Sequence, residues 1–324
     1  MAGTVTHFYF ANDVMSSISK KKKIVYDEDL LKIFAQSMDT FNFYSIFFPI
    51  KNKSSEIRKF ANKFHCNKTD VFFETLINYI KGKNLSTNIY VMTFLYGLIT
   101  HYILDSSMHP YVEYKCGRFN SKDKKTYKYN AKHHEMETFI DIYMLEKHEI
   151  NAKYFKAYKE LFKINSFDIE LKNVMNYTFK KVFNFENFDK YYLKSIKDMK
   201  YSFQIFRYDP YGCKKAFYRL FDLFSTKKVL NSKFLSYNYI PKNAFNYLNL
   251  EHKTWYYPFD IAKKYDCSFD EIYNDAVKRC VNVIIKVENY IEKNKELDLK
   301  SLFNLSYCTG LDLKILEKSP SYEF

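Results

Sequence analysis

Apolar side chains recur every three to four positions through most of the chain, which is the period of an amphipathic helix. The pattern predicts helices over about 27–48, 69–82, 86–109, 130–148, 168–181, 188–206, 211–225 and 268–293. Asp27 stands at a predicted helix N-cap, while Gly82 and Pro110 stand where two helices are expected to end. No internal repeat or linker interrupts the series. We therefore expect one all-α domain over residues 1–324.

The composition favours the same fold class. The 324 residues include 32 Phe, 31 Tyr and one Trp, but only 6 Gly and 6 Pro. So few turn-forming residues argue against a β-sandwich or barrel, and an apolar share of 47% excludes a disordered chain.

The formal net charge is +14, from 51 Lys and Arg against 37 Asp and Glu. Most of the basic residues are spread along the chain and are expected on solvated helix faces, and the run Lys20–Lys23 is expected in a solvated loop. The segment Lys115–Lys132 differs, because it holds seven basic residues against one acid. A connection of this length is usually functional or disordered. Its candidates for attracting an anionic substrate are Lys122, Lys124, Lys125 and Lys128.

The first fifteen residues lack the basic segment and apolar stretch of a secretion signal. The longest apolar stretch, residues 89–100, is too short to span a bilayer. The six cysteines are scattered, with no C-x2-4-C pair among them. These features predict a cytoplasmic protein with reduced thiols and no transmembrane helix.

The sharpest local pattern is His101, Asp105 and His109, spaced four residues apart in a predicted helix. Residues four apart share a helix face, so His101 and Asp105 can present an imidazole and a carboxylate to one cation. Gly97, on the same face, leaves room for a neighbouring element. Because the helix is otherwise apolar, the two polar groups need partners. A metal ion would satisfy both, and a hydrogen-bonded His–Asp pair is the alternative.

The next predicted helix repeats this spacing with His133 and Glu137. Asp141 follows one turn later and could accept a hydrogen bond from a ligand N–H. Two helices that each present a His and a carboxylate suggest zinc, which binds both ligand types at about 2.0–2.2 Å. His134 points about 100° away from this face and is the weaker candidate.

A wider set of residues resembles the zinc-dependent phospholipase C family, whose all-α fold is shared with single-strand-specific zinc nucleases. The motifs lie in THFYFANDVM with His7, QSMDTFNFY with Asp39, KFHCNKTDVFF with His65, GLITHYILDSSMHPY with His101, Asp105 and His109, and HHEMETFIDIYMLEK with His133 and Glu137. This resemblance covers residues 1–150, and 151–324 is expected to be a helical remainder. The segments LNLEHKTWYYPFD and SYCTGL look like parts of an uncharacterised cytoplasmic branch of the family.

The resemblance implies two or three zinc ions. Asp39, His65, His101 and Asp105 would hold one ion. A second, with an open position for water or substrate, would be held by His109, His133 and Glu137. A third would use His7, a bridging Asp105, and the amine and carbonyl of the chain's N-terminus.

The implied activity is hydrolysis of an anionic phosphodiester, either a phospholipid head group or a soluble phosphodiester. The zinc cluster would activate a water molecule that Asp39 orients or deprotonates. A single-strand nuclease on the same fold is one alternative, with aromatic rings stacking on bases. A non-catalytic protein in which zinc only joins helices is another. An open coordination position would distinguish the enzymes from the latter, because structural zinc is closed and four-coordinate.

Overall fold

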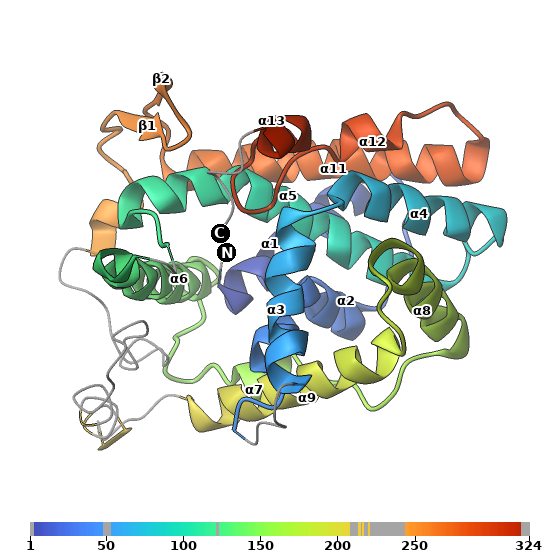
Figure 1. The fold of residues 1–324 in the computed structure, drawn as a ribbon, viewed down its shortest axis with the longest axis horizontal. Coiled ribbons are helices and arrows are strands. Elements are labelled where there is room, and N and C mark those ends of the chain that lie inside the picture. Colours follow the sequence, from blue (N-terminus) through green and yellow to red (C-terminus); the bar gives the residue numbers. More distant parts are fainter. Residues whose placement is uncertain are drawn as a thin grey trace.

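The computed structural model describes residues 3–47, 53–120, 123–207 and 244–318, together with 213, 214, 216 and 220. The described chain is all-α apart from one short hairpin (Figure 1). In chain order its elements are α1 (Thr4–Ser19), α2 (Glu28–Phe34), η1 (Ser37–Phe43), α3 (Lys53–Cys66), α4 (Thr69–Gly82), α5 (Ile89–Cys116), η2 (Lys124–Thr126), α6 (Tyr127–Lys147), α7 (Ala157–Glu160), α8 (Ile169–Phe183), α9 (Phe188–Ile205), η4 (Ala244–Tyr247), β1 (Trp255–Tyr257), β2 (Asp260–Tyr265), α11 (Phe269–Lys293), α12 (Leu299–Leu302) and α13 (Leu313–Lys318).

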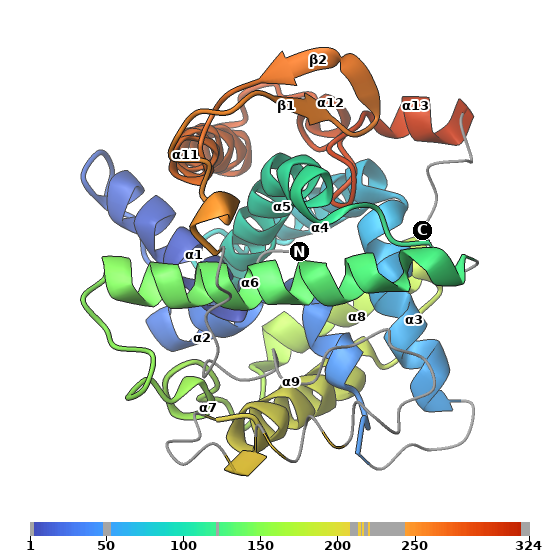
Figure 2. The same ribbon diagram turned by 90° about the vertical axis from the view of Figure 1, so that its left-hand side faces the viewer.

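Helix α5 lies at the centre of the fold. Every residue from Val91 to Ser106 is buried, so the helix is covered on all sides rather than along one face. Figure 2 shows α5 nearly end-on, with α11 running alongside it and α6 crossing it at a steep angle. The apolar core that surrounds α5 extends along the chain from Val5 to Tyr307.

Most of the predicted helices are confirmed. Helix α4 has the predicted bounds, and α6, α8, α9 and α11 begin and end within three residues of the prediction. The side chain of Asp27 caps α2 by accepting a hydrogen bond from the Leu30 backbone N–H at 2.8 Å. Most of the predicted helix over 211–225 lies outside the described residues. None of the described helices is long and apolar enough to cross a membrane.

Two predicted helix ends are wrong. The helix that follows Asp27 ends at Phe34 rather than near residue 48, because Ser37 has a left-handed backbone (φ 46°) that no helix continues through. Helix α5 does not end before Pro110 but runs on to Cys116. Proline removes one helical hydrogen bond, to the carbonyl of Ser106. Packing of the helix on both sides of Pro110 outweighs this local cost.

The hydrophobic pattern did not predict α1, α3 or the hairpin β1–β2. The two strands are antiparallel, with Trp255 opposite Tyr265. Trp255 is buried, and its ring packs on those of Tyr111 and Tyr265. The hairpin thus covers the C-terminal half of α5.

Candidate metal centre

The centre is built on the face of α5 that meets the end of α2. His101 Nε2 lies 3.2 Å from Asp105 Oδ2, as their spacing predicts. His101 Nδ1 lies 2.9 Å from the Ala35 carbonyl oxygen, to which it must donate. Helix α2 comes this close because Gly97 has no side chain: a Cβ there would lie 2.4 Å from Phe34 Cβ. The prediction that Gly97 makes room for a neighbour is confirmed.

Three residues from other elements complete what we call the inner cluster: His7 on α1, Asp39 on η1 and His65 on α3. His7 Nε2 lies 3.3 Å from Asp105 Oδ1, and the His7 ring stacks on the His101 ring with centroids 4.2 Å apart. His65 Nε2 lies 3.2 Å from His101 Nε2 and 3.6 Å from Asp39 Oδ1. The inner cluster therefore joins four separate elements of the first 105 residues.

Two groups within the inner cluster each offer three potential ligand atoms within 4.8 Å of one another. They are His7–His101–Asp105 and Asp39–His65–His101. Both groups share His101, so they are adjacent. All five residues are buried, the most accessible being Asp39 at 8% exposure.

Burial sets the charge of most of these groups. It lowers the pKa of His7 to about 4 and that of His65 well below its usual value, so both imidazoles are neutral. Burial also raises the pKa of Asp39 to about 7. For Asp105 the effect of burial is overcome by His101 and His7, which hold its pKa well below the usual range. Neutral imidazoles and a carboxylate are the forms that bind a metal ion.

Buried atoms of the inner cluster that have no hydrogen-bond partner within the described structure include both ring nitrogens of His7 and Asp39 Oδ1. A buried polar atom without a partner costs about 1–3 kcal/mol. A divalent cation would supply the missing partner, and a mixed set of imidazoles and carboxylates suits zinc. The residues present therefore fit the predicted metal.

His109, His133 and Glu137, which we call the outer trio, lie close together beside the inner cluster. The His109 and His133 ring centroids are 5.8 Å apart, and His133 Nε2 lies 3.1 Å from Glu137 Oε1. Among the described residues, the trio does not form a group as compact as the two in the inner cluster. The side chains of His133 and Glu137 are 23% and 13% exposed, so this part of the centre reaches the surface.

The outer trio combines two imidazoles of lowered pKa with a carboxylate of lowered pKa. Burial lowers the pKa of His109 to about 3, and it also lowers that of His133. Burial by itself would raise the pKa of Glu137, but the neighbouring His133 holds that pKa well below the usual value. His134 also contacts Glu137, with Nδ1 3.0 Å from Oε2. Sequence reasoning that placed His134 on another face missed this contact.

Asp141 lies at the N-terminus of α1, the helix that carries His7. It accepts hydrogen bonds from the backbone N–H groups of Val5 and Thr6, at 3.1 and 2.8 Å, and from the Thr6 hydroxyl at 2.7 Å. Gly3 packs so closely that a Cβ there would lie 2.3 Å from Asp141 Oδ1. These contacts position α1, and a direct hydrogen bond from Asp141 to a ligand imidazole stays a prediction.

Two further predictions concern residues that lie partly outside the described ranges. The N-terminal amine and carbonyl expected at a third zinc lie outside them, as does Lys122. Lys124 and Lys125 lie in η2 and Lys128 in the first turn of α6, and all three are exposed. The basic connection is shorter than predicted, because α5 extends to Cys116 and α6 begins at Tyr127.

The C-terminal loop Ser306–Leu311 reaches the centre, a role that was not predicted from the sequence although SYCTGL resembles a segment of the family. The carbonyl of Tyr307 accepts a hydrogen bond from His109 Nδ1 at 2.5 Å, and its ring packs on His65 with centroids 5.0 Å apart. Gly310 (φ 64°) lets the loop lie against α5, since a Cβ there would lie 2.5 Å from the carbonyl oxygen of Ser106. The periodicity of apolar residues in the sequence does not reveal such a contact, because it depends on backbone groups and on distant elements packing together.

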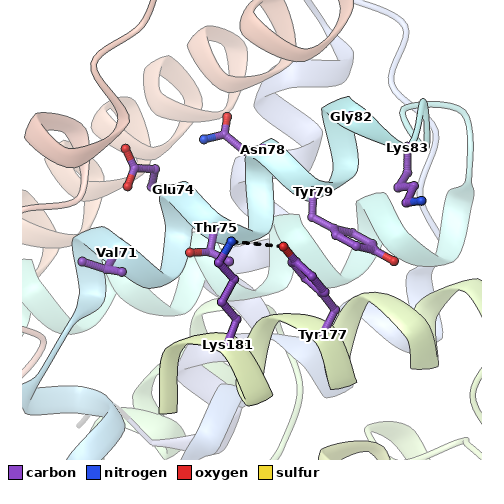
Figure 3. A pocket seen from close by; sticks show the side chains of 9 residues that line it. All are labelled: Val71, Glu74, Thr75, Asn78, Tyr79, Gly82, Lys83, Tyr177 and Lys181. Carbon is purple, nitrogen blue, oxygen red and sulfur yellow. Dashed lines mark hydrogen bonds between the residues drawn. The ribbon is translucent and has the colours of Figure 1, made fainter. Parts of the chain in front are cut away.

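A separate groove of about 520 Å³ lies between α4 and α8, and none of the predicted site residues lines it (Figure 3). The rings of Tyr79 and Tyr177 stack on each other there at 4.3 Å, and Lys181 donates to the Tyr177 hydroxyl at 3.2 Å. The two rings cover each other's faces. They therefore offer no free surface between them for a nucleic-acid base.

Residues 6–185, more than half of the chain, match the family described as zinc dependent phospholipase C. The matched region contains every side chain that is predicted to bind metal. No curated protein and no solved structure matches the chain. The all-α fold and the buried His and Asp groups agree with this match and with a metal-dependent hydrolase. The chain therefore belongs to the zinc dependent phospholipase C family.

Proposed function

We propose that this protein hydrolyses phosphodiesters in the manner of a phospholipase C, with two or three zinc ions bound at the inner cluster and the outer trio. The observation that carries the proposal is the inner cluster, where five His and Asp side chains converge while both ring nitrogens of His7 and Asp39 Oδ1 have no hydrogen-bond partner among the described residues. When bound, zinc would neutralise phosphate oxygens and lower the pKa of water from about 15.7 towards 7.

Two backbone carbonyls determine which ring nitrogen of His101 and of His109 is free to bind metal. The carbonyls of Ala35 and Tyr307 accept the Nδ1 protons of His101 and His109, which leaves Nε2 of each ring as the ligand atom. Asp39, His65, His101 and Asp105 would hold one ion, and the outer trio would hold another. His7 and Asp105 would contribute to a third.

Asp39 is the proposed general base. Burial raises its pKa to about 7 in the metal-free protein, and its carboxylate could orient the water or accept a proton from it. The partly exposed side chains of His133 and Glu137 give substrate a route to the outer trio. The exposed Lys124 and Lys125 precede these residues along the same part of the chain and would attract an anionic substrate.

The test combines metal counting with a substrate panel. Protein purified without added metal should contain two or three equivalents of zinc by mass spectrometry. It should hydrolyse a choline phospholipid or a glycerophosphodiester, and chelation should abolish the activity. Cleavage of single-stranded DNA in preference to both would support the nuclease alternative. Bound zinc without any hydrolysis would support a purely structural metal.

Asp105 gives a sharper test because it contacts both His7 and His101. Asp105→Ala should remove more than one equivalent of metal, since the carboxylate is proposed to bridge two ions. Asp275→Ala, at an exposed position on α11, is the matched control and should keep the full complement. Loss of one equivalent or none from Asp105→Ala would contradict the bridge.

A further inference from the structure

Two cysteines far apart in the sequence meet beside the metal centre. Cys66 is the last residue of α3, and Cys308 lies in the loop Ser306–Leu311. Their Sγ atoms are 3.4 Å apart, and both residues are partly accessible to solvent. The two thiols are thus in contact and open to a small oxidant.

Each of these cysteines is the chain neighbour of a residue that shapes the centre. His65 precedes Cys66 and faces Asp39 and His101. Tyr307 precedes Cys308, and its carbonyl holds His109 Nδ1. The Tyr307 ring also packs on His65. A bond between the two sulfur atoms would therefore act on the inner cluster and the outer trio together.

We propose that Cys66 and Cys308 form a reversible disulfide that weakens zinc binding at the adjacent centre. The oxidant is a peroxide. One thiol loses its proton, and the resulting thiolate attacks H₂O₂, giving a sulfenic acid; the leaving hydroxide takes up that proton and departs as water. The second thiol then attacks the sulfenic sulfur, the S–S bond forms, and a second water leaves. Two thiols lose two electrons and two protons, while one H₂O₂ becomes two H₂O.

The effect on zinc follows from the movement that the bond requires. A disulfide would bring the sulfur atoms from 3.4 Å to about 2.05 Å. The loop is held by the close approach of Gly310 to Ser106, and α3 by its packing on the core, so neither can follow without strain. That strain acts on the residues next to the two cysteines, so the His65 imidazole or the Tyr307 carbonyl shifts. Disturbing the groups that hold metal ligands in place lowers metal affinity about 10- to 100-fold.

The bond itself is tested by trapping. The full-length protein is reduced, titrated with H₂O₂, alkylated with N-ethylmaleimide and digested without reductant. We expect one peptide pair joined through Cys66 and Cys308, released again by dithiothreitol. Cys213→Ser, which removes an exposed cysteine, should leave this pair unchanged, and Cys66→Ala or Cys308→Ala should abolish it. Oxidation of Cys213 while Cys66 and Cys308 are still alkylated would overturn the proposal.

The coupling to the centre is tested by zinc competition against a chelator. Oxidised protein should bind zinc at least tenfold more weakly than reduced protein, whereas peroxide should not change the affinity of Cys308→Ala. Equal affinity of the bridged and reduced forms would refute the coupling. The effect on zinc rests on the proposed function, but trapping requires neither metal nor turnover. The trapping experiment would therefore still test the disulfide if the protein hydrolysed none of the substrates in the panel.

Discussion

Gly97→Ala tests whether close approach of α2 to α5 builds the metal centre. The added Cβ would lie 2.4 Å from Phe34 Cβ, 2.7 Å from the Phe34 carbonyl carbon and 3.0 Å from the Ala35 nitrogen. Two of these atoms belong to the backbone, so the end of α2 must move. The Ala35 carbonyl would then leave His101 Nδ1, which it now meets at 2.9 Å.

The expected cost combines three effects. Overpacking of a dense core costs about 1–3 kcal/mol. Loss of the hydrogen bond to His101 adds about 0.5–1.5 kcal/mol. Replacing Gly by Ala in a helix returns about 1 kcal/mol. The free energy of unfolding of the metal-free protein should therefore fall by about 0.5–3.5 kcal/mol. Zinc affinity should fall about 10- to 100-fold because His101 is no longer held.

Denaturant unfolding of the chelator-treated protein measures the first effect, and zinc competition measures the second. Bound metal stabilises the folded state by mass action, so unfolding is measured on metal-free protein, where a loss of zinc affinity cannot contribute to the change in stability. Gly82→Ala is the matched control: no atom lies within 4 Å of a Cβ at this end of α4. That variant should be unchanged or gain up to about 1 kcal/mol. A Gly97→Ala protein with the same free energy of unfolding and the same zinc affinity as the wild type would refute the reasoning.

Zinc affinity should rise with pH up to about 7, because Asp39 has a pKa of about 7 and must lose its proton to bind metal, with a loss of about tenfold per pH unit below that value. Competition titrations that show no pH dependence would contradict this. Lys22→Met should lower the free energy of unfolding by about 1–2 kcal/mol, because Lys22 is only partly exposed and pairs with the buried Glu288 at 3.1 Å. Denaturant unfolding measures the change, and Lys23→Met, at an exposed position, should have little effect. Replacing Lys124 and Lys125 with Glu should raise KM for anionic substrates, most strongly at low salt, and unchanged kinetics would rule out their role in substrate attraction.

The sequence alone indicated the fold class and the local part of the site. Helical periodicity predicted α4, α6, α8, α9 and α11, because each buries a face that the 3.6-residue repeat reveals. The same repeat put His101 beside Asp105 and His133 beside Glu137, since residues four apart are neighbours on any helix. Resemblance to a family, rather than periodicity, connected these pairs to His7, Asp39 and His65.

Only the tertiary structure decided how these pairs meet and what orients them. The carbonyls of Ala35 and Tyr307 are backbone groups that every residue carries, so no side-chain pattern distinguishes them. The contact of Cys66 with Cys308 joins positions 242 residues apart. Lys22, expected in a solvated loop, pairs with Glu288 and Glu292 of α11. Such contacts depend on the packing of distant elements, whereas periodicity records only whether each element has a face to bury.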